Sequence, residues 1–283
     1  MISKPLLDQL KFPVTEQEVI QSGPVNRCHR IASGTSSYFL KVNNASGCPM
    51  LFEKEYNALK ALSGRNALRV PEPLKWGIAG EEQYLLLEWM DTAAPLPKSW
   101  ELLGSGLARI HREGAPYFGF FEDNYLSVWP QENTVTVTWP EFYGNHRILP
   151  LIRELYHSGI LTKADSTLAE RFCRRLPELF PDEQPALLHG DLWSGNILFT
   201  MRGEPVVVDP AVYYGHREMD IGMTLLFGGF TQDFYSSYEA VYPLSSGWRQ
   251  RLPFSQLYPL LIHAFLFGGN YVSSVRAVLN RFR

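Results

Sequence analysis

The stretch that most constrains this chain is His-Gly-Asp-Leu-Trp-Ser-Gly-Asn at residues 189–196, which lies between apolar segments. It leads into Ile-Leu-Phe at residues 197–199, and after a turn-forming segment a Val-Val-Val run ends at Asp209. The pattern predicts a short loop followed by a hairpin of two aliphatic strands. Because hairpin strands lie side by side, we expect the loop to meet the end of the second strand.

This arrangement brings together the side chains of Asp191, Asn196 and Asp209. Oxygen ligands suit Mg²⁺, which binds one or two carboxylates and completes its shell with waters and phosphate oxygens. We therefore expect Asn196 and Asp209 to hold Mg²⁺, which leaves Asp191 free to accept a proton from a hydroxyl. A base beside two metal ligands is the division of labour in a phosphotransferase.

Two other interpretations apply to the same residues. Any one of the three, taken alone, is more often a turn or cap residue. His189, two positions before Asp191, also permits a metallohydrolase in which imidazoles bind zinc. The seven histidines are scattered and none forms an i,i+4 pair, so the hydrolase is the less favoured prediction.

The central stretch resembles the catalytic loop of the protein-kinase-like fold in its small-molecule branch, where glycine replaces the arginine of the His-Arg-Asp loop. Together with Tyr-Gly-His-Arg-Glu-Met-Asp at residues 214–220 and Leu-Phe-Gly-Gly-Asn-Tyr at 266–271, it resembles the fructosamine kinases, or ketosamine 3-kinases, over nearly the whole chain. The resemblance implies an α+β, protein-kinase-like fold with two lobes. A small N-terminal nucleotide-binding lobe with a five-stranded antiparallel sheet and one helix would cover residues 1–91, and a larger, mainly helical catalytic and substrate-binding lobe would cover 92–283.

Lys41 is the charged residue of the small lobe that calls for a partner. It lies in an apolar strand predicted over residues 38–42, where an isolated lysine is costly unless it is paired or at an edge. A helix predicted over residues 50–62 can turn Glu55 inward. Such a pair resembles the ion pair that positions the α- and β-phosphates of ATP in kinases, and the alternative is that Glu55 is one more exposed carboxylate.

The nucleotide contacts are predicted from the order of the strands. Strands at residues 18–21 and 27–32 form a hairpin whose turn, with Gly23, would lie over phosphates, although an ordinary turn is the stronger interpretation for a single glycine. Strands at 74–78 and 84–87 follow. They lead to the expected hinge, whose backbone would bind the adenine edge: Glu88, Trp89, Met90 and Asp91.

The remaining chain has helical periodicity. Ser99 is expected to cap the first of these helices, which are predicted at residues 99–111, 142–161, 165–180 and 254–267. Only ten residues, 210–219, separate Asp209 from Asp220, which leaves no room for a long phosphorylated activation segment. The family resemblance implies that Asp220 supports the catalytic loop through hydrogen bonds.

The resemblance also implies the substrates: ATP, and a ketosamine on a free or protein-bound amine. Phosphorylation on the third carbon of the sugar would give an unstable product that releases the amine, which amounts to deglycation. Trp193 is expected to stack on the sugar or the amine, with His263 and Asn270 nearby. Core packing or capping explains these three residues equally well.

Two alternatives remain from the sequence. One is another small-molecule kinase of the same fold, acting on choline, an aminoglycoside or methylthioribose. The other is a non-catalytic protein that binds ATP without turnover. The presence of Lys41, Asp191, Asn196 and Asp209 together makes the second alternative the weaker one.

Charge and cysteine usage narrow the class of protein. The net charge is −3, from 26 basic and 29 acidic residues without a basic block, which argues against binding to nucleic acid or a membrane surface. Three cysteines without Cys-x-x-Cys spacing indicate neither a disulfide framework nor a zinc site. The chain opens without the apolar run of a secretory signal. We expect a cytoplasmic protein, and its oligomeric state is left open.

Overall fold

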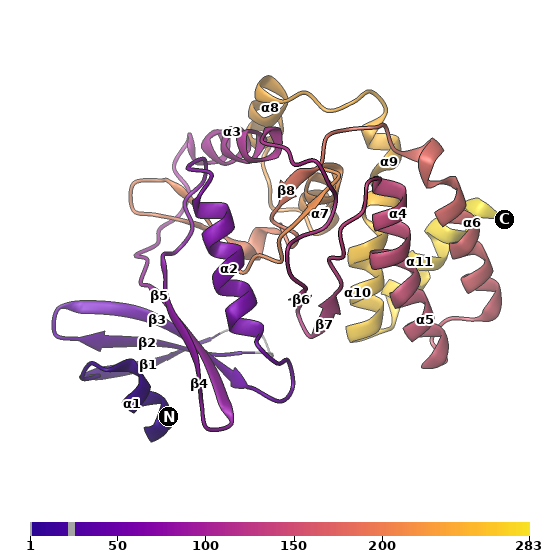
Figure 1. The fold of residues 1–283 in the computed structure, drawn as a ribbon. Coiled ribbons are helices and arrows are strands. Elements are labelled where there is room, and N and C mark those ends of the chain that lie inside the picture. The colour runs from indigo at the N-terminus through magenta and orange to yellow at the C-terminus, as the bar shows by residue number, and fades with distance from the viewer. Residues whose placement is uncertain (1, 22–25) are drawn as a thin grey trace.

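The N-terminal part is a five-stranded antiparallel sheet with strand order β1-β2-β3-β5-β4, flanked by two helices (Figure 1). The computed structural model describes residues 2–21 and 26–283. The elements of this part are α1 (Lys4–Leu10), β1 (Glu16–Ile20), β2 (Arg27–Ser33), β3 (Ser36–Asn44), α2 (Leu51–Ser63), β4 (Pro73–Ala79) and β5 (Glu82–Glu88). The predicted five strands and the helix that follows the third are confirmed, with boundaries that differ by a few residues.

Side chains alternate between the two faces of the sheet along the central strands, and each face is covered by one helix. Leu40 and Val42 of β3 pack on the face covered by α1. Leu85 and Leu87 of β5 belong to the core on the opposite face, which α2 covers. Since successive residues of a strand point to opposite faces, Lys41 points toward α2, directly opposite Leu85 in the register.

The C-terminal part is mainly helical (Figure 1). Its helices are α3 (Ser99–Arg112), α4 (Trp139–Tyr143), η1 (Gly144–Ile148), α5 (Leu149–His157), α6 (Lys163–Leu179), η2 (Ser194–Asn196), α7 (Glu218–Leu226), α8 (Gln232–Val241), α9 (Trp248–Ser255), α10 (Leu257–Phe267), α11 (Asn270–Leu279) and η3 (Asn280–Phe282). Its short strands form three antiparallel pairs: β6 (Asn124–Leu126) with β7 (Trp129–Gln131), β8 (Ala186–Leu188) with β11 (Tyr213–Gly215), and β9 (Ile197–Phe199) with β10 (Pro205–Val207). No helix in the described ranges is both long and apolar enough to cross a membrane.

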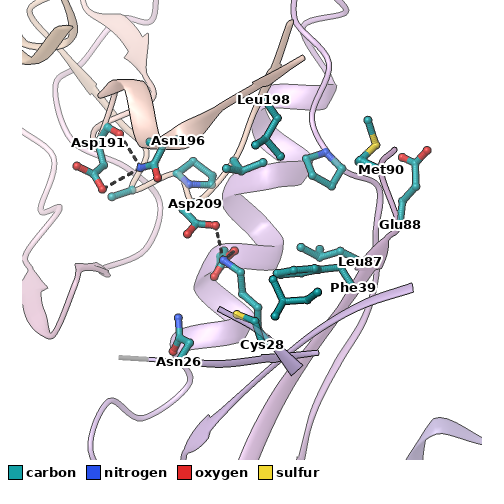
Figure 2. Close-up of a pocket in the computed structure, with 18 of the residues that line it drawn as sticks. Asn26, Cys28, Phe39, Leu87, Glu88, Met90, Asp191, Asn196, Leu198 and Asp209 are labelled. Carbon is teal, nitrogen blue, oxygen red and sulfur yellow. Dashed lines mark hydrogen bonds and ion pairs between the residues drawn. The ribbon is translucent and has the colours of Figure 1, made fainter. Parts of the chain in front are cut away.

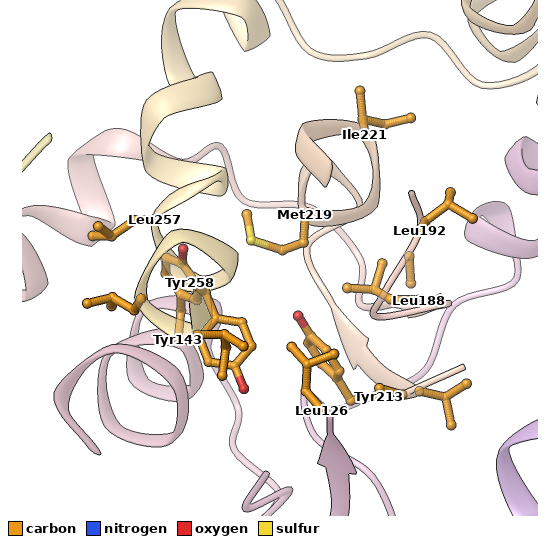
Figure 3. Packing of buried hydrophobic residues seen from close by; sticks show 14 of the residues in the cluster. Leu126, Tyr143, Leu188, Leu192, Tyr213, Met219, Ile221, Leu257 and Tyr258 are labelled. Carbon is orange, nitrogen blue, oxygen red and sulfur yellow. The ribbon is translucent and has the colours of Figure 1, made fainter. Parts of the chain in front are cut away.

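The core of this part contains buried tyrosines near the loop at residues 189–196. Tyr143, Tyr213 and Tyr258 belong to the same core as Leu188, which precedes the loop, and Leu192, which lies within it (Figure 3). All five side chains are almost completely buried. The loop at residues 189–196 therefore starts from the buried core.

Three sequence expectations about helices are wrong in detail. The helix predicted over residues 142–161 is divided into α4, the π-helical η1 and α5, and the one over 254–267 is divided between α9 and α10. In both cases a proline, Pro150 or Pro259, has no amide proton to donate to the carbonyl four residues earlier. Ser99 is not a cap: its hydroxyl accepts from Leu96 N and donates to Gly203 O.

Candidate active site

The loop at residues 189–196 requires glycine at its second position. Gly190 has φ +83°, and a Cβ atom there would lie 2.0 Å from the carbonyl oxygen of Ala211. Its amide and that of His189 donate to the carboxylate of Asp220 at 3.0 and 2.7 Å. Asp220 thus holds the loop backbone, as the family resemblance implied.

The surroundings of Asp220 set its own charge and the tautomer of His189. Burial alone would raise the pKa of Asp220, but hydrogen bonds and the proximity of His111 and His189 lower it. Burial lowers the pKa of His189, so this ring is neutral at physiological pH. Its Nε2 lies 3.0 Å from the carbonyl oxygen of Val208, which can only accept, so Nε2 carries the proton. The other ring nitrogen accepts from the amide of Asp191.

Asp191 and Asn196 face each other across the loop (Figure 2). Asn196 Nδ2 donates to the carboxylate Oδ2 of Asp191 at 3.0 Å and to its backbone oxygen at 2.9 Å. Enclosure by protein raises the pKa of Asp191 to about 7, against the effect of the hydrogen bond from Asn196. The amide nitrogen of Asn196 is thereby directed at Asp191, which leaves the amide oxygen for a different partner.

Lys41 lies between two carboxylates from distant parts of the chain. Its Nζ is 2.6 Å from Glu55 Oε1. It also contacts the carboxylate of Asp209, which Figure 2 labels. Burial would lower the pKa of this lysine, but the two carboxylates more than offset that effect and raise it. The predicted contact between Lys41 and Glu55 is confirmed. Asp209 has φ +57°, an unusual conformation for a residue with a side chain, and its carboxylate is half exposed.

A cavity of about 1200 Å³ joins these groups. Most of the residues singled out in the sequence line it: Lys41, Glu55, Glu88, Trp89, Met90, Asp91, Asp191, Trp193, Asn196 and Asp209. Gly23 lies outside the described residues. The cavity thus receives side chains from the sheet, from α2, from the expected hinge and from the catalytic loop.

His263 and Asn270 are not among the residues that line this cavity. The ring of Trp193 is edge-on to Phe227 at 6.4 Å, and Phe227 lies 4.8 Å from the ring of His263. His263 is therefore one ring removed from Trp193, with its Nδ1 near the carbonyl of Pro259. Asn270 is exposed at the start of α11. Of these three residues, the structure brings only Trp193 to the cavity.

The sequence did not identify the β6–β7 hairpin as part of the site. Asn124, Tyr125, Leu126 and Ser127 line the cavity, although the strands of this hairpin are only three residues long. Such short strands carry no useful hydrophobic period, so no sequence signal marks them. Lys54 of α2 also lines the cavity and was not predicted.

The donor set fits a hard cation that is shared with a phosphate. No cluster of three or more His, Cys, Asp or Glu side chains with a metal-binding arrangement occurs in residues 2–21 and 26–283. Mg²⁺ does not need one, since it takes one or two protein ligands and fills its shell with waters and phosphate oxygens. Asn196 and Asp209 offer oxygen atoms of this kind, and the amide of Val208 donates to Asn196 O at 3.1 Å, which holds the two segments together.

Comparison with known proteins identifies the family. The family model described as fructosamine kinase matches residues 2–282. The chain belongs to this family. An Enterococcus faecium protein assigned as a ketoamine kinase is 39% identical, with 93% of this chain and 94% of that protein covered. The chloroplastic protein-ribulosamine 3-kinase of Arabidopsis thaliana is 36% identical, with 94% and 82% covered.

Solved structures show the same fold. A Haemophilus somnus crystal structure assigned as a fructosamine-3-kinase superposes with a TM-score of 0.89 at 26% identity, over 99% of this chain and 96% of that one. An aminoglycoside phosphotransferase in complex with ADP and hygromycin B superposes with a TM-score of 0.64 at 17% identity, over 97% and 96%. At that identity the second likeness concerns the fold alone. The protein-kinase-like fold expected from the fructosamine kinase motifs is thereby confirmed.

Proposed function

We propose that this member of the fructosamine kinase family transfers the γ-phosphoryl group of ATP to the third-carbon hydroxyl of ketosamines, such as ribulosamines or fructosamines. The observation that carries the proposal is the convergence of Lys41, Asp191, Asn196 and Asp209 on one cavity of about 1200 Å³. Pockets for a single small ligand are usually about 300–1000 Å³. The cavity is large enough for a nucleotide and an acceptor together. Relatives named as ketoamine and ribulosamine kinases support this acceptor class.

ATP would lie with its adenine against the segment from Glu88 to Asp91 and its phosphates toward Lys41. The apolar side chains of Phe39, Leu87 and Leu198 line the cavity near this segment and suit a flat base (Figure 2). Lys41 keeps its positive charge at all relevant pH values, because both carboxylates raise its pKa. The aminoglycoside phosphotransferase of the same fold was crystallised with ADP, which supports a nucleotide as the phosphoryl donor. The proposed division into a nucleotide-binding lobe over residues 1–91 and a catalytic lobe over 92–283 follows from this placement.

Asn196 and Asp209 would hold Mg²⁺ through their side-chain oxygens. Bound there, the ion would neutralise charge on the phosphates. Asp209 is already half exposed toward the cavity, whereas Asn196 is buried and fixed by its two bonds to Asp191. Asn196 is therefore held by Asp191, and Asp209 is held by Lys41 while its carboxylate stays open to the cavity.

Asp191 would orient the acceptor hydroxyl and take its proton as the hydroxyl oxygen attacks the γ-phosphorus and the bond to the β-phosphate oxygen breaks. A pKa of about 7 is suitable for a base that works near neutral pH, because the carboxylate is both available and able to hold a proton. The bond from Asn196 Nδ2 keeps Oδ2 in place, so Oδ1 is the oxygen that faces the hydroxyl.

Trp193 would stack on the sugar or the amine portion of the acceptor, because its partly exposed ring lies beside Asp191 at the cavity. The ketosamine 3-phosphate is unstable and releases the amine, so the biological role would be deglycation of free or protein-bound amines. A cytoplasmic location, without nucleic acid or membrane partners, is consistent with the use of ATP and with the absence of a basic block in the sequence.

The test is Mg·ATP consumption by the purified protein with ribulosamine- and fructosamine-type acceptors, compared with choline and an aminoglycoside. Asp191→Asn is the matched variant, since it keeps the shape of the side chain and the bond from Asn196. We expect phosphorylation of a ketosamine by the wild type and a loss of rate of about 10³-fold or more in the variant. Turnover of choline or the aminoglycoside alone would contradict the ketosamine proposal and leave the assignment of the base intact.

A further inference from the structure

One carboxylate from the C-terminal part of the molecule bonds to two side chains of α2. Glu122, in the connection between α3 and β6, accepts a hydrogen bond from Lys54 Nζ at 2.7 Å and one from Asn57 Nδ2 at 2.9 Å. Both donors belong to α2, and they lie on either side of Glu55 in the sequence. Residues three apart share one face of a helix, so Glu122 holds one face of α2, while Glu55, the residue after Lys54, contacts Lys41 from a different face.

Glu122 is itself held from the interior of the C-terminal part. Its backbone oxygen accepts from Asn133 Nδ2 at 3.0 Å, and the amide of Asn133 donates to Asp123 at 2.7 Å. Arg147 Nη2 donates to Asn133 Oδ1 at 2.6 Å. Asn133 and Arg147 are almost completely buried, so the loop that carries Glu122 rests on rigid packing.

Arg147 is anchored in an unusual way. Within the described ranges it forms no ion pair with a carboxylate; its guanidinium lies 4.2 Å from the ring centre of Tyr213 and 4.5 Å from that of Phe142. A buried cation between aromatic faces is stabilised by their negative potential. The contacts from these rings through Asn133 to Glu122 therefore connect the core beneath the catalytic loop to α2.

A second contact fixes the start of α2. The hydroxyl of Tyr125 in β6 donates to the carbonyl of Pro49, two residues before the helix begins. The same hairpin lines the cavity, so α2 lies between the sheet and this hairpin (Figure 1). Beyond the other end of α2, Arg65 Nη1 donates to Glu113 Oε2 at 2.9 Å, in a contact that does not involve Glu122.

In protein kinases an activation segment controls whether the corresponding helix brings its glutamate to the lysine. Here only residues 210–219 separate Asp209 from Asp220. We propose that Glu122 replaces that control as a positioning residue: it fixes α2 so that Glu55 and Lys41 stay paired in the absence of any modification. This inference rests on the proposed function, because it assumes that Lys41 acts on the phosphates of ATP.

The experiment is a double-mutant cycle between Glu122→Ala and Glu55→Gln, with kcat, the KM for ATP, the dissociation constant of Mg·ATP and the melting temperature measured for each protein. If Glu122 acts through the Lys41–Glu55 pair, Glu122→Ala should lower kcat/KM for ATP by about 10-fold or more and weaken Mg·ATP binding in the wild-type background. In the Glu55→Gln background it should change either quantity by less than about twofold. Non-additivity of this kind separates positioning from a general loss of stability.

Two further variants make the result decisive. Glu122→Gln keeps the acceptor for Asn57 and loses the ion pair with Lys54, so we expect an intermediate loss of about threefold; this variant decides the question if Glu122→Ala does not fold. Glu113→Ala removes an ion pair between the same two parts of the molecule at the distal end of α2, and should remain within about twofold of wild type.

Wild-type kcat/KM and nucleotide affinity in Glu122→Ala would overturn the inference, and so would equal losses in both backgrounds. If the wild-type protein phosphorylates no ketosamine, the proposed function fails, but the Mg·ATP affinities of the four proteins in the cycle still decide the role of Glu122.

Discussion

Asp191 lies at the end of a chain of contacts that begins at His111 and passes through Asp220 and His189. Each member fixes the next: His111 bonds to the carboxylate, the carboxylate holds two amides, and the neutral His189 ring receives the amide of Asp191. These contacts fix the position of Asp191, and its raised pKa of about 7 makes its protonation state depend on pH near neutrality.

The raised pKa of Asp191 predicts the pH dependence of turnover. Below about pH 7 the carboxylate is protonated and cannot accept the hydroxyl proton, so kcat/KM for the acceptor should fall about tenfold per pH unit. The measurement is a pH–rate profile between pH 5.5 and 8.5, with full recovery after return to pH 8 as the control for unfolding. A flat profile across this range would contradict the assignment of Asp191 as the base.

The same pKa predicts a gain in stability when the base is removed. A carboxyl group whose pKa is 3.8 in isolation and about 7 in the folded protein resists ionisation on folding, so it costs stability above pH 4, most of all above pH 7. Asp191→Asn should be more stable than wild type by about 1–3 kcal/mol at pH 8, with a smaller gain at pH 5. Urea unfolding at both pH values tests this, and a variant less stable than wild type at pH 8 would disprove it.

The sequence predicted which site residues lie together where those residues are close along the chain. Asp191, Asn196 and Asp209 lie within one loop and hairpin, so local pattern alone brought them together. The Lys41–Glu55 pair was inferred because a buried strand lysine needs a partner. His263 and Asn270 failed to reach the cavity because their positions depend on how α10 and α11 pack, which no local pattern states.

At the scale of elements, α3 and α8 show how closely two helices approach when glycine lies between them. A Cβ atom on Gly104 of α3 would lie 2.1 Å from the carbonyl oxygen of Phe234 in α8. His111, in the last turn of α3, bonds to Asp220 and to the hydroxyl of Tyr238 in α8. The packing of these two helices therefore supports the anchor of the catalytic loop.

Gly104→Ala should lower the free energy of unfolding by about 1–3 kcal/mol, because the methyl group collides with rigid backbone and outweighs the better helix propensity of alanine. Thermal or urea unfolding measures the loss. Arg109→Ala, an exposed change on the same helix, is the control and should alter stability by no more than about 0.5 kcal/mol. Equal stability of both variants would show that the helices separate easily.

The strands of the N-terminal part were predictable because turn residues bound short apolar segments, and α2 because its apolar residues recur at helical spacing. The C-terminal helices were less so. In α7 nearly every residue is buried, so no polar face marks it, and α8 mixes aromatic and polar residues without a clear stripe. The β6–β7 hairpin has strands too short to predict, although it contributes to the cavity and leads from Glu122.

At the scale of the whole molecule, both parts contribute to the cavity, and few backbone contacts join them. Val207 N donates to Arg69 O at 3.0 Å and joins the two parts, and just after the expected hinge Ala93 N donates to Phe199 O at 2.9 Å. The Arg69 guanidinium bonds to Glu88 at 2.7 Å, at the edge of the expected hinge. A ligand that fills the cavity contacts both sides at once.

Mg·ATP should therefore stabilise the whole protein, by about 2.7 kcal/mol at a concentration of 100 times its dissociation constant. Asp209→Asn should lose the part of this gain that depends on Mg²⁺, whereas Asp191→Asn should keep most of it. Melting curves with ATP, with and without Mg²⁺, measure both effects. Equal stabilisation of wild type and Asp209→Asn by Mg·ATP would exclude Asp209 as a metal ligand.

The short connection between Asp209 and Asp220 has a consequence for how such an enzyme serves a cell. A kinase without a segment to be phosphorylated at this point is not switched by phosphorylation there, so we expect its output to follow the supply of its acceptor and its own abundance. Such behaviour suits the proposed deglycation, because glycated amines form without an enzyme and without a signal.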